Sequence, residues 1–276
     1  TTGSLDETSA LCRAIAPSSH FLESWGDAEP VRGHISMIQP TIAPLFDTRQ
    51  RETSLLKWIG GENTLFSSEQ PYYEYLKARW SATTGSANSW TELLHDGVYT
   101  YTPALSGASY KDNVASVAGK LTQPGSGQEI TFMETVAMGA GQNANNPWLQ
   151  EMPDPVTRCA WGNYLALPVA FDGTRKFIAH ENLEDGDLAD VTLGEQKLRV
   201  PVIKQFGQTP DSFALAVGYG RSVTGRAGAN VGVNVHPWMK TDADDLVQYY
   251  ATGVTVSGKQ GEEDYFSCVQ YHHTMG

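Results

Sequence analysis

Residues 184–237 read EDGDLADVTLGEQKLRVPVIKQFGQTPDSFALAVGYGRSVTGRAGANVGVNVHP, and this stretch decides the fold. An acidic turn opens it, and short apolar runs follow at residues 188–193, 198–203 and 213–217. Runs of β-branched residues between Gly and Pro are typical of strands. Glycines then recur at positions 218, 220, 225, 228 and 232. The pattern predicts a compact, closed β unit with one glycine-rich lobe.

Composition and charge narrow the class of protein. The chain has 276 residues, enough for two compact units, and its 19 Lys and Arg against 31 Asp and Glu give a net charge of −12. A nucleic-acid surface needs clustered Lys and Arg, so no nucleic-acid partner is expected. No run of about 18 apolar residues occurs, and we expect no membrane-spanning segment in this chain.

The cysteines and histidines suggest no metal site. The three cysteines are isolated, at Cys12, Cys159 and Cys268. They show no CxxC or Cys–His spacing, and their odd number predicts no disulfide framework. His34, His180 and His236 are scattered, while the adjacent His272 and His273 would point to opposite faces of a strand. We therefore expect no metal ligands within the chain.

The order of the expected elements indicates two units. A capping box at residues 4–7 predicts a first helix, and residues 20–25 read as a strand. Helices expected at 49–59, 69–80 and 89–95 make residues 1–105 an α/β unit. Residues 106–124 read as a linker, and residues 125–276 as a β-rich unit. Both ends look cut, so we expect an interior piece of a longer polypeptide.

Polar residues in two glycine-rich stretches are the candidate binding residues. Gly220 and Arg221 belong to a Gly-Tyr-Gly-Arg sequence that does not match the dinucleotide fingerprint. Arg221 and Arg226 can reach an anion such as a phosphate, or they can pack on carboxylates within a turn. Asn145 and Asn146 can bond the edge of a heterocycle, or satisfy their own backbone in a turn.

No catalytic motif accompanies these candidates. The patterns GxSxG, HExxH and the P-loop are all missing from the sequence. Glu23 and Asp27, close to Trp25, form a possible carboxylate pair, although such residues on an extended segment more often bond neighbouring amides. We expect no catalytic residue in the chain.

Three segments carry a resemblance to a known family: FLESWGDAEPVRGHISMIQPTIAPLFDTRQ at 21–50, NANNPWLQEMPDPVTRCAWGNYLALP at 143–168, and GDLADVTLGEQKLRVPV with ALAVGYGRSVTGRAGANVGVN at 186–234. Together they resemble the molybdopterin oxidoreductase family. Within it they are most similar to the large iron–sulfur subunit of alternative complex III, a bacterial quinol:electron acceptor oxidoreductase. The resemblance covers nearly the whole chain and is weakest at residues 106–128.

The resemblance implies a fold and a role. It implies that residues 1–105 are the C-terminal part of the α/β cofactor domains, and that residues 125–276 form a double-psi β-barrel. In catalytic relatives this barrel holds one end of a pterin dinucleotide, with the loop containing Asn145, Asn146 and Trp148 near the pterin. The subunit resembled is expected to lack molybdenum, which leaves this loop, Gly220, Arg221 and Arg226 as vestigial candidates.

The resemblance also implies partners and a location. Iron–sulfur clusters are expected in a ferredoxin-like domain that follows the barrel, outside this chain. A multihaem cytochrome c subunit and integral membrane quinol-binding subunits are the expected partners. The expected place is the periplasmic side of the cytoplasmic membrane, with this chain as a peripheral scaffold for the iron–sulfur domain.

Two other functions stay open at this point. One is a molybdopterin-dependent oxidoreductase acting on a small oxyanion or sulfur compound, which would contact its cofactor through Asn145, Asn146 and residues 218–226. The other is a sugar- or nucleotide-binding β-domain that folds and binds alone.

Overall fold

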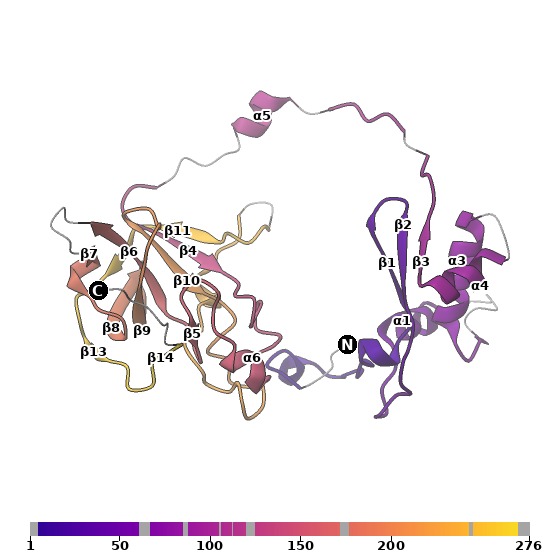
Figure 1. The fold of residues 1–276 in the computed structure, drawn as a ribbon, viewed down its shortest axis with the longest axis horizontal. Helices are drawn as coiled ribbons and strands as arrows, with labels where there is room; N and C mark the ends of the chain where they lie inside the picture. Colours follow the sequence, from indigo (N-terminus) through magenta and orange to yellow (C-terminus); the bar gives the residue numbers. More distant parts are fainter. Residues whose placement is uncertain are drawn as a thin grey trace, which may run out of the picture. The chain divides into compact units, whose positions relative to one another are not determined.

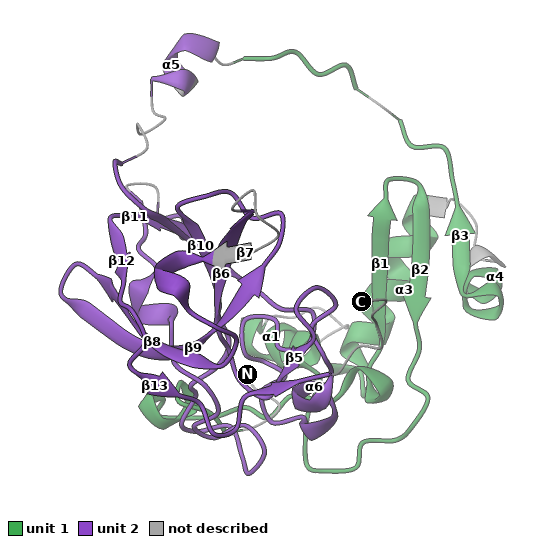
Figure 2. Ribbon diagram, turned by 60° about the vertical axis from the view of Figure 1, so that its left-hand side comes forward, with its two compact units in different colours: residues 1–112 green, residues 113–276 purple. Residues whose placement is uncertain are grey.

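The computed structural model describes residues 5–60, 67–84, 88–104, 106–111, 113–119, 125–171, 177–242 and 245–269. The chain divides into two compact units, unit 1 at Thr1–Asp112 and unit 2 at Asn113–Gly276 (Figures 1 and 2). No described helix has the length and apolar character needed to cross a membrane.

Unit 1 joins a small antiparallel sheet to a group of helices. Its three strands, in the order β1-β2-β3, are β1 (Gly26–Val31), β2 (His34–Ile38) and β3 (Val98–Thr100). Its α-helices are α1 (Arg51–Ile59), α3 (Pro71–Thr84) and α4 (Asn88–Asp96), with 3-10 turns η1 (Ser9–Leu11) and η2 (Phe21–Glu23). The small core is formed by Ile35, Leu76, Trp80, Trp90 and Leu93. The three helices expected from apolar spacing are confirmed within a few residues.

Two expectations for the start of unit 1 are not met. The strand expected at 20–25 is wrong, because side chains close a 3-10 turn there. The Leu22 N–H donates to His20 Nδ1 (3.3 Å), and the His20 N–H donates to Glu23 Oε2 (2.9 Å). Ser4, the first residue of the expected capping box, lies outside the described residues. The stretch after it forms only the short turn η1, in which Asp6 Oδ1 accepts from the Ser9 N–H at 2.7 Å.

Unit 2 is built on one large mixed sheet. Its strand order is β11-β4-β10-β6-β9-β8-β12, with β7 paired to β6 and β13 paired to β8. The bounds are β4 (Glu129–Met133), β6 (Leu165–Phe171), β7 (Phe177–Ala179), β8 (Asp187–Leu193), β9 (Gln196–Gln205), β10 (Ser212–Ala216), β11 (Tyr250–Thr252), β12 (Val254–Val256) and β13 (Gly261–Glu262). A separate ribbon pairs β5 (Cys159–Ala160) with β14 (Ser267–Cys268), and the helical elements are α5 (Val114–Ala118), α6 (Pro147–Glu151), η3 (His180–Asn182) and η4 (His236–Trp238).

The sheet of unit 2 curls into a nearly closed, barrel-like form. Its first and last strands, β11 and β12, are separated in the chain by Gly253 alone. Two strands at opposite ends of the order therefore come from one continuous stretch, which brings the ends of the sheet together. Within the sheet, β10 is parallel to β4, β6 is parallel to β9, and β10 and β6 run antiparallel to each other.

Alternating apolar residues of these strands fill the barrel. Fully buried examples are Ile130, Leu165, Val191, Val202, Phe213 and Leu215. The three strands expected from residues 184–217 are confirmed as β8, β9 and β10. Strand β6 starts only at Leu165, because left-handed backbone at Trp161 (φ 54°) and Gly162 (φ 112°) prevents an earlier start. Near the C-terminal end of the unit, an isolated antiparallel bridge joins Thr241 and Val247.

Candidate functional site: the glycine-rich lobe and the asparagine loop

The glycine-rich lobe (residues 218–234) lies directly on the asparagine loop (residues 139–148). A Cβ atom on Gly218 would lie 2.7 Å from the Gly139 carbonyl oxygen and 2.8 Å from the Gly141 nitrogen. A Cβ on Gly228 would lie 2.2 Å from the Ala144 carbonyl oxygen. At Gly218 and at Gly228 the backbone of the lobe contacts the backbone of the loop directly, and only a residue without a Cβ atom permits so close an approach.

Hydrogen bonds join the same two segments. Arg221 donates from NH1 to the Gly141 carbonyl oxygen at 2.7 Å. Asn145 accepts, through Oδ1, the N–H of Ala227 at 3.2 Å. The structure thus brings together the two stretches that the sequence singled out separately, and it joins them by contacts within the protein.

The asparagine loop also satisfies its own backbone. Asn146 is the N-cap of α6, where its Oδ1 accepts from the Leu149 N–H at 3.2 Å, with Pro147 in the first turn. Asn143 Nδ2 donates to the Ala137 carbonyl oxygen at 3.0 Å. Of the two interpretations open for these amides, the turn-forming one describes Asn146. Trp148, in the same helix, has its side chain 80% exposed.

The lobe is closed internally as well. The Gly220 N–H donates to the Val231 carbonyl oxygen at 2.7 Å, and the Asn230 N–H donates to the Arg221 carbonyl oxygen at 2.7 Å. Gly220 has φ +68°, and a Cβ on it would lie 2.1 Å from the Asn234 nitrogen. Arg226 is exposed.

Asn163 holds the lobe to the barrel, and the sequence reasoning missed it. Its side chain is only 3% exposed, and its Nδ2 donates to the carbonyl oxygens of Ala216 (2.8 Å) and Val233 (3.0 Å). Its Oδ1 accepts from the Val233 N–H at 2.9 Å. An amide inside an otherwise apolar run was the available signal, because buried polar groups need partners.

These residues do not fit a pterin dinucleotide between the loop and the lobe. The 2.2–2.8 Å approaches at Gly218 and Gly228 leave no gap there for a ring system or a pyrophosphate. Arg221 NH1 and the Oδ1 atoms of Asn145 and Asn146 are bonded to backbone groups of the protein. Of the remaining three candidates, Gly220 lies against the backbone of Asn234, while Trp148 and Arg226 are exposed and line neither cavity given below for unit 2.

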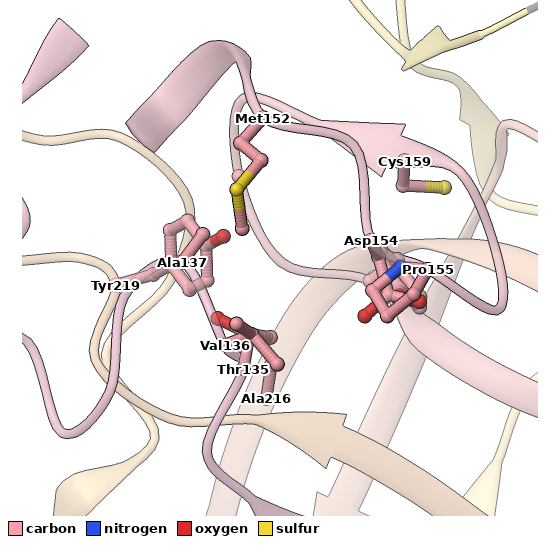
Figure 3. A pocket seen from close by; sticks show the side chains of 11 residues that line it. Thr135, Val136, Ala137, Met152, Asp154, Pro155, Cys159, Ala216 and Tyr219 are labelled. Atoms are coloured by element: carbon pink, nitrogen blue, oxygen red, sulfur yellow. The ribbon is translucent and has the colours of Figure 1, made fainter. Parts of the chain in front are cut away.

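The first cavity of unit 2 holds no more than a water molecule. Its volume is about 10 Å³, close to the minimum that admits one water. Figure 3 shows Tyr219 on one side of it and Cys159 at the other edge, with the sulfur directed away from the tyrosine ring. Burial raises the pKa of the Tyr219 phenol and of Tyr164, which also lines this cavity, so both are neutral at pH 7.

A second, larger cavity shares Cys159, Gly162 and Tyr164 with the first. Its volume is about 330 Å³, and its other lining residues include Trp161, Asn163, Arg199, Glu263, Tyr265 and Phe266. Arg199 forms an ion pair with Asp190, because its Nε and NH2 donate to the Asp190 carboxylate at 2.7 and 3.0 Å. The lining therefore combines aromatic side chains with polar and charged ones, and its cation, Arg199, is paired.

The other candidates of the sequence are bound within the protein. Glu23 accepts the backbone N–H groups of Leu45 (3.0 Å) and His20 (2.9 Å), which lower its pKa. Asp27 accepts from Trp80 Nε1 at 2.9 Å. These two carboxylates bond separate partners: Glu23 accepts a neighbouring amide, as the alternative predicted, whereas the partner of Asp27 is an indole that is distant in sequence.

The histidines also lie apart. His180 Nε2 bonds the Val256 carbonyl oxygen (3.3 Å), and His236 Nε2 bonds that of Ala140 (3.2 Å). Across the described ranges, no group of three or more His, Cys, Asp and Glu side chains could hold a metal ion. His272 and His273 fall outside those ranges.

Comparison with known proteins gives a likeness of fold. No family model matches the chain, and no curated protein matches it in sequence. Among solved structures, acetylene hydratase from Pelobacter acetylenicus superposes with a TM-score of 0.56 at 12% identity over 88% of this chain. The matched part is 37% of that protein, so this chain spans well under half of its length.

Acetylene hydratase belongs to the molybdopterin oxidoreductase family. The mixed α/β architecture with its nearly closed barrel-like sheet is consistent with domains of that family. At 12% identity the likeness concerns the fold alone. It does not extend to the finer resemblance to a subunit of alternative complex III.

Proposed function

We propose that this chain is a structural part of a molybdopterin-oxidoreductase-like protein, in which the barrel serves as a scaffold and does not bind the pterin dinucleotide. The parent protein would be the peripheral iron–sulfur subunit of a quinol:electron acceptor oxidoreductase of the alternative complex III type.

One observation carries the scaffold role. The lobe and the loop that would face a pterin are packed on each other, with Gly228 so placed that a Cβ would lie 2.2 Å from the Ala144 carbonyl oxygen. Arg221, one of the two candidate cations for a phosphate, donates to the Gly141 carbonyl oxygen at 2.7 Å. A binding cleft needs concave space and free polar groups, and here both are used for internal contacts.

The strand order supports a barrel of the double-psi type. The central antiparallel pair β10–β6 is flanked by two parallel pairs, β10–β4 and β6–β9. In strand direction, the order β4-β10-β6-β9 is therefore symmetric about its centre, and the connection from β6 to β9 is nested in sequence within the connection from β4 to β10. We propose that these two parallel pairs, related by a pseudo-two-fold axis, form the centre of a double-psi barrel in unit 2.

The electron-transfer role rests on the three sequence segments that resemble the alternative complex III subunit. In this proposal the parent protein carries iron–sulfur clusters in a ferredoxin-like domain outside this chain. Its partners are a multihaem cytochrome c and integral membrane quinol-binding subunits, on the periplasmic side of the cytoplasmic membrane. The net charge of −12 suits a peripheral protein surface with no nucleic-acid partner.

Purification of the parent protein from its own cells tests this role. We expect it to extract with the membrane fraction in detergent, to co-purify with a haem-staining subunit, and to catalyse acceptor reduction by an added quinol. A protein that is recovered alone, without haem and without quinol oxidation, would contradict the electron-transfer role.

A molybdopterin-dependent oxidoreductase acting on a small oxyanion or sulfur compound is the second candidate. The fold likeness to acetylene hydratase favours it. Exposed Trp148 and Arg226 would then have to meet the cofactor on the outer side of the loop and the lobe. Substituting both by alanine would release a pterin from such an enzyme, whereas the scaffold role predicts no change in its metal or pterin content.

A further inference from the structure

Two cysteines that are 109 residues apart in the chain meet in unit 2. Cys159 of β5 pairs directly with Cys268 of β14 in antiparallel register, and their Sγ atoms lie 3.1 Å apart. The Cys159 side chain is buried, with 5% exposed, while Cys268 is exposed. This pair differs from the third cysteine, Cys12, which lies in unit 1.

The backbone places this pair where two side chains can be linked. The Val269 N–H donates to the Arg158 carbonyl oxygen at 2.9 Å, one residue beyond Cys268 and one before Cys159. This bond marks Cys159 and Cys268 as a non-hydrogen-bonded pair, the class in which facing side chains are closest, with Cα atoms about 4.5 Å apart. That spacing lies inside the range of about 4.4–6.8 Å that disulfides require.

The local backbone holds Cys159 in a defined position. Left-handed, non-glycine residues lie on both sides of β5, Arg158 with φ 63° and Trp161 with φ 54°. Such conformations persist only where the surroundings fix them. Cys159 also packs with Tyr164, Ala166 and Ile203, and Phe266 from the β14 side packs against the same cluster.

The two thiols have different reactivity. The hydrogen bond from Cys159 stabilises the thiolate of Cys268 and lowers the pKa of that thiol. The same bond, together with burial, raises the pKa of Cys159. Thiolates are the attacking species in disulfide exchange, so the exposed Cys268 reacts first and the buried Cys159 follows.

We propose that Cys159 and Cys268 form a reversible disulfide by exchange with an external disulfide, either that of a small thiol such as glutathione or that of a thiol–disulfide oxidoreductase. The Cys268 thiolate attacks one sulfur of the oxidant, forming a mixed disulfide and releasing one thiolate. Cys159, losing its proton to solvent, attacks the Cys268 sulfur and releases the second thiol. The two cysteines lose two electrons and two protons, and the oxidant is reduced to two thiols.

This disulfide would fix the position of the segment that forms one wall of the larger cavity. Tyr265 and Phe266 line that cavity and directly precede β14, which has only two paired residues. In the dithiol form the β14 segment is held by this short ribbon and by the packing of Phe266. In the disulfide form it is fixed covalently to β5, and the cavity keeps its wall. This inference does not depend on the proposed electron-transfer role.

Exchange with oxidised glutathione tests the pair on the whole chain. The protein is reduced, freed of reductant, incubated with oxidised glutathione, quenched with N-ethylmaleimide and digested for mass spectrometry. We expect peptides linked through Cys159 and Cys268, with Cys12 free of any link to either, and reversal of the bond by dithiothreitol without denaturant. Two alkylated cysteines at 159 and 268, or glutathione retained on Cys268, would overturn the proposal.

Amide exchange provides a second readout, which compares the oxidised and reduced forms of the same protein. Residues 263–269 should exchange more slowly in the oxidised protein, by a factor of about 30 or more if the bond has the typical effect of a disulfide. Cys268→Ser should remove this difference, while Cys12→Ser should retain it. Equal exchange in the two forms would show that the bond does not hold the cavity wall.

Discussion

Replacing Gly228 by alanine tests the contact between the glycine-rich lobe and the asparagine loop. The added Cβ would lie 2.2 Å from the Ala144 carbonyl oxygen, 2.5 Å from its carbon and 2.7 Å from Thr224 Oγ1. Real Cβ contacts are longer than about 3 Å, so backbone must move on one side or the other. Overpacking of this kind costs about 1–3 kcal/mol.

Gly258 in the same unit provides the matched control. Nothing lies within 4 Å of the position that its Cβ would take, and neither Gly258 nor Gly228 has a positive φ. Gly258→Ala should therefore stabilise unit 2 by about 0.4–1 kcal/mol, through the lower entropy of the unfolded chain. Together the two variants should differ by about 1.4–4 kcal/mol in the free energy of unfolding.

Amide hydrogen exchange in a urea series measures this difference in the whole chain. Peptides covering β9 and β10 report the unfolding of unit 2, because central strands exchange through global opening. If Gly228→Ala proves as stable as Gly258→Ala, the lobe does not touch the loop. The space between them would then be open to a ligand, and the scaffold argument would fail.

Three further predictions concern an ion pair, a buried amide and a core leucine. Asp190 accepts hydrogen bonds from Arg199 Nε at 2.7 Å and from Lys197 Nζ at 2.8 Å, and these bonds hold the pKa of its carboxyl below the ordinary value. The contribution of Asp190 to the free energy of unfolding is therefore full above about pH 4, and it is lost as the pH falls through the lowered pKa. Asp190→Asn should flatten the acid limb of a stability–pH profile. Asn163→Ala should destabilise unit 2 by about 2–4 kcal/mol in urea unfolding, because it leaves buried backbone groups without partners. Leu76→Ala should destabilise unit 1 by about 2–5 kcal/mol, read from exchange of α3 peptides, because its side chain is fully buried.

Each of these predictions has a result that contradicts it. Glu195→Gln, an exposed change in the β8–β9 turn, is the control for Asp190, and equal acid profiles for the two variants would refute the ion-pair argument. Leu45 is 71% exposed, so Leu45→Ala should change stability by less than about 0.5 kcal/mol. If Leu76→Ala matched it, the unit 1 core would be misassigned. An Asn163→Ala protein of unchanged stability would show that the lobe is held to the barrel by other contacts.

Much of the fold follows from local sequence pattern. Apolar runs bounded by turns located β8, β9 and β10, because strand periodicity and glycine punctuation are properties of neighbouring residues. The segment at residues 20–25 was misjudged because His20 and Glu23 bond the backbone there, and such side-chain competition overrides strand propensity.

The candidate site was less predictable because it depends on pairing between distant segments. The sequence selected Asn145 and Arg221 separately, but nothing in their local pattern says that Arg221 reaches Gly141 or that Gly228 lies on Ala144. The cysteine pair was missed for the same reason. Cys159 and Cys268 have no informative spacing, and only the antiparallel register of β5 and β14 brings them together.

Metal and pterin analysis of the parent protein, purified from its own cells without chelators, tests the central claim most directly. The scaffold account predicts iron from clusters outside this chain. It predicts no stoichiometric molybdenum or tungsten, and no stoichiometric fluorescence from an oxidised pterin. One molybdenum or tungsten per protein, accompanied by a pterin, would contradict it.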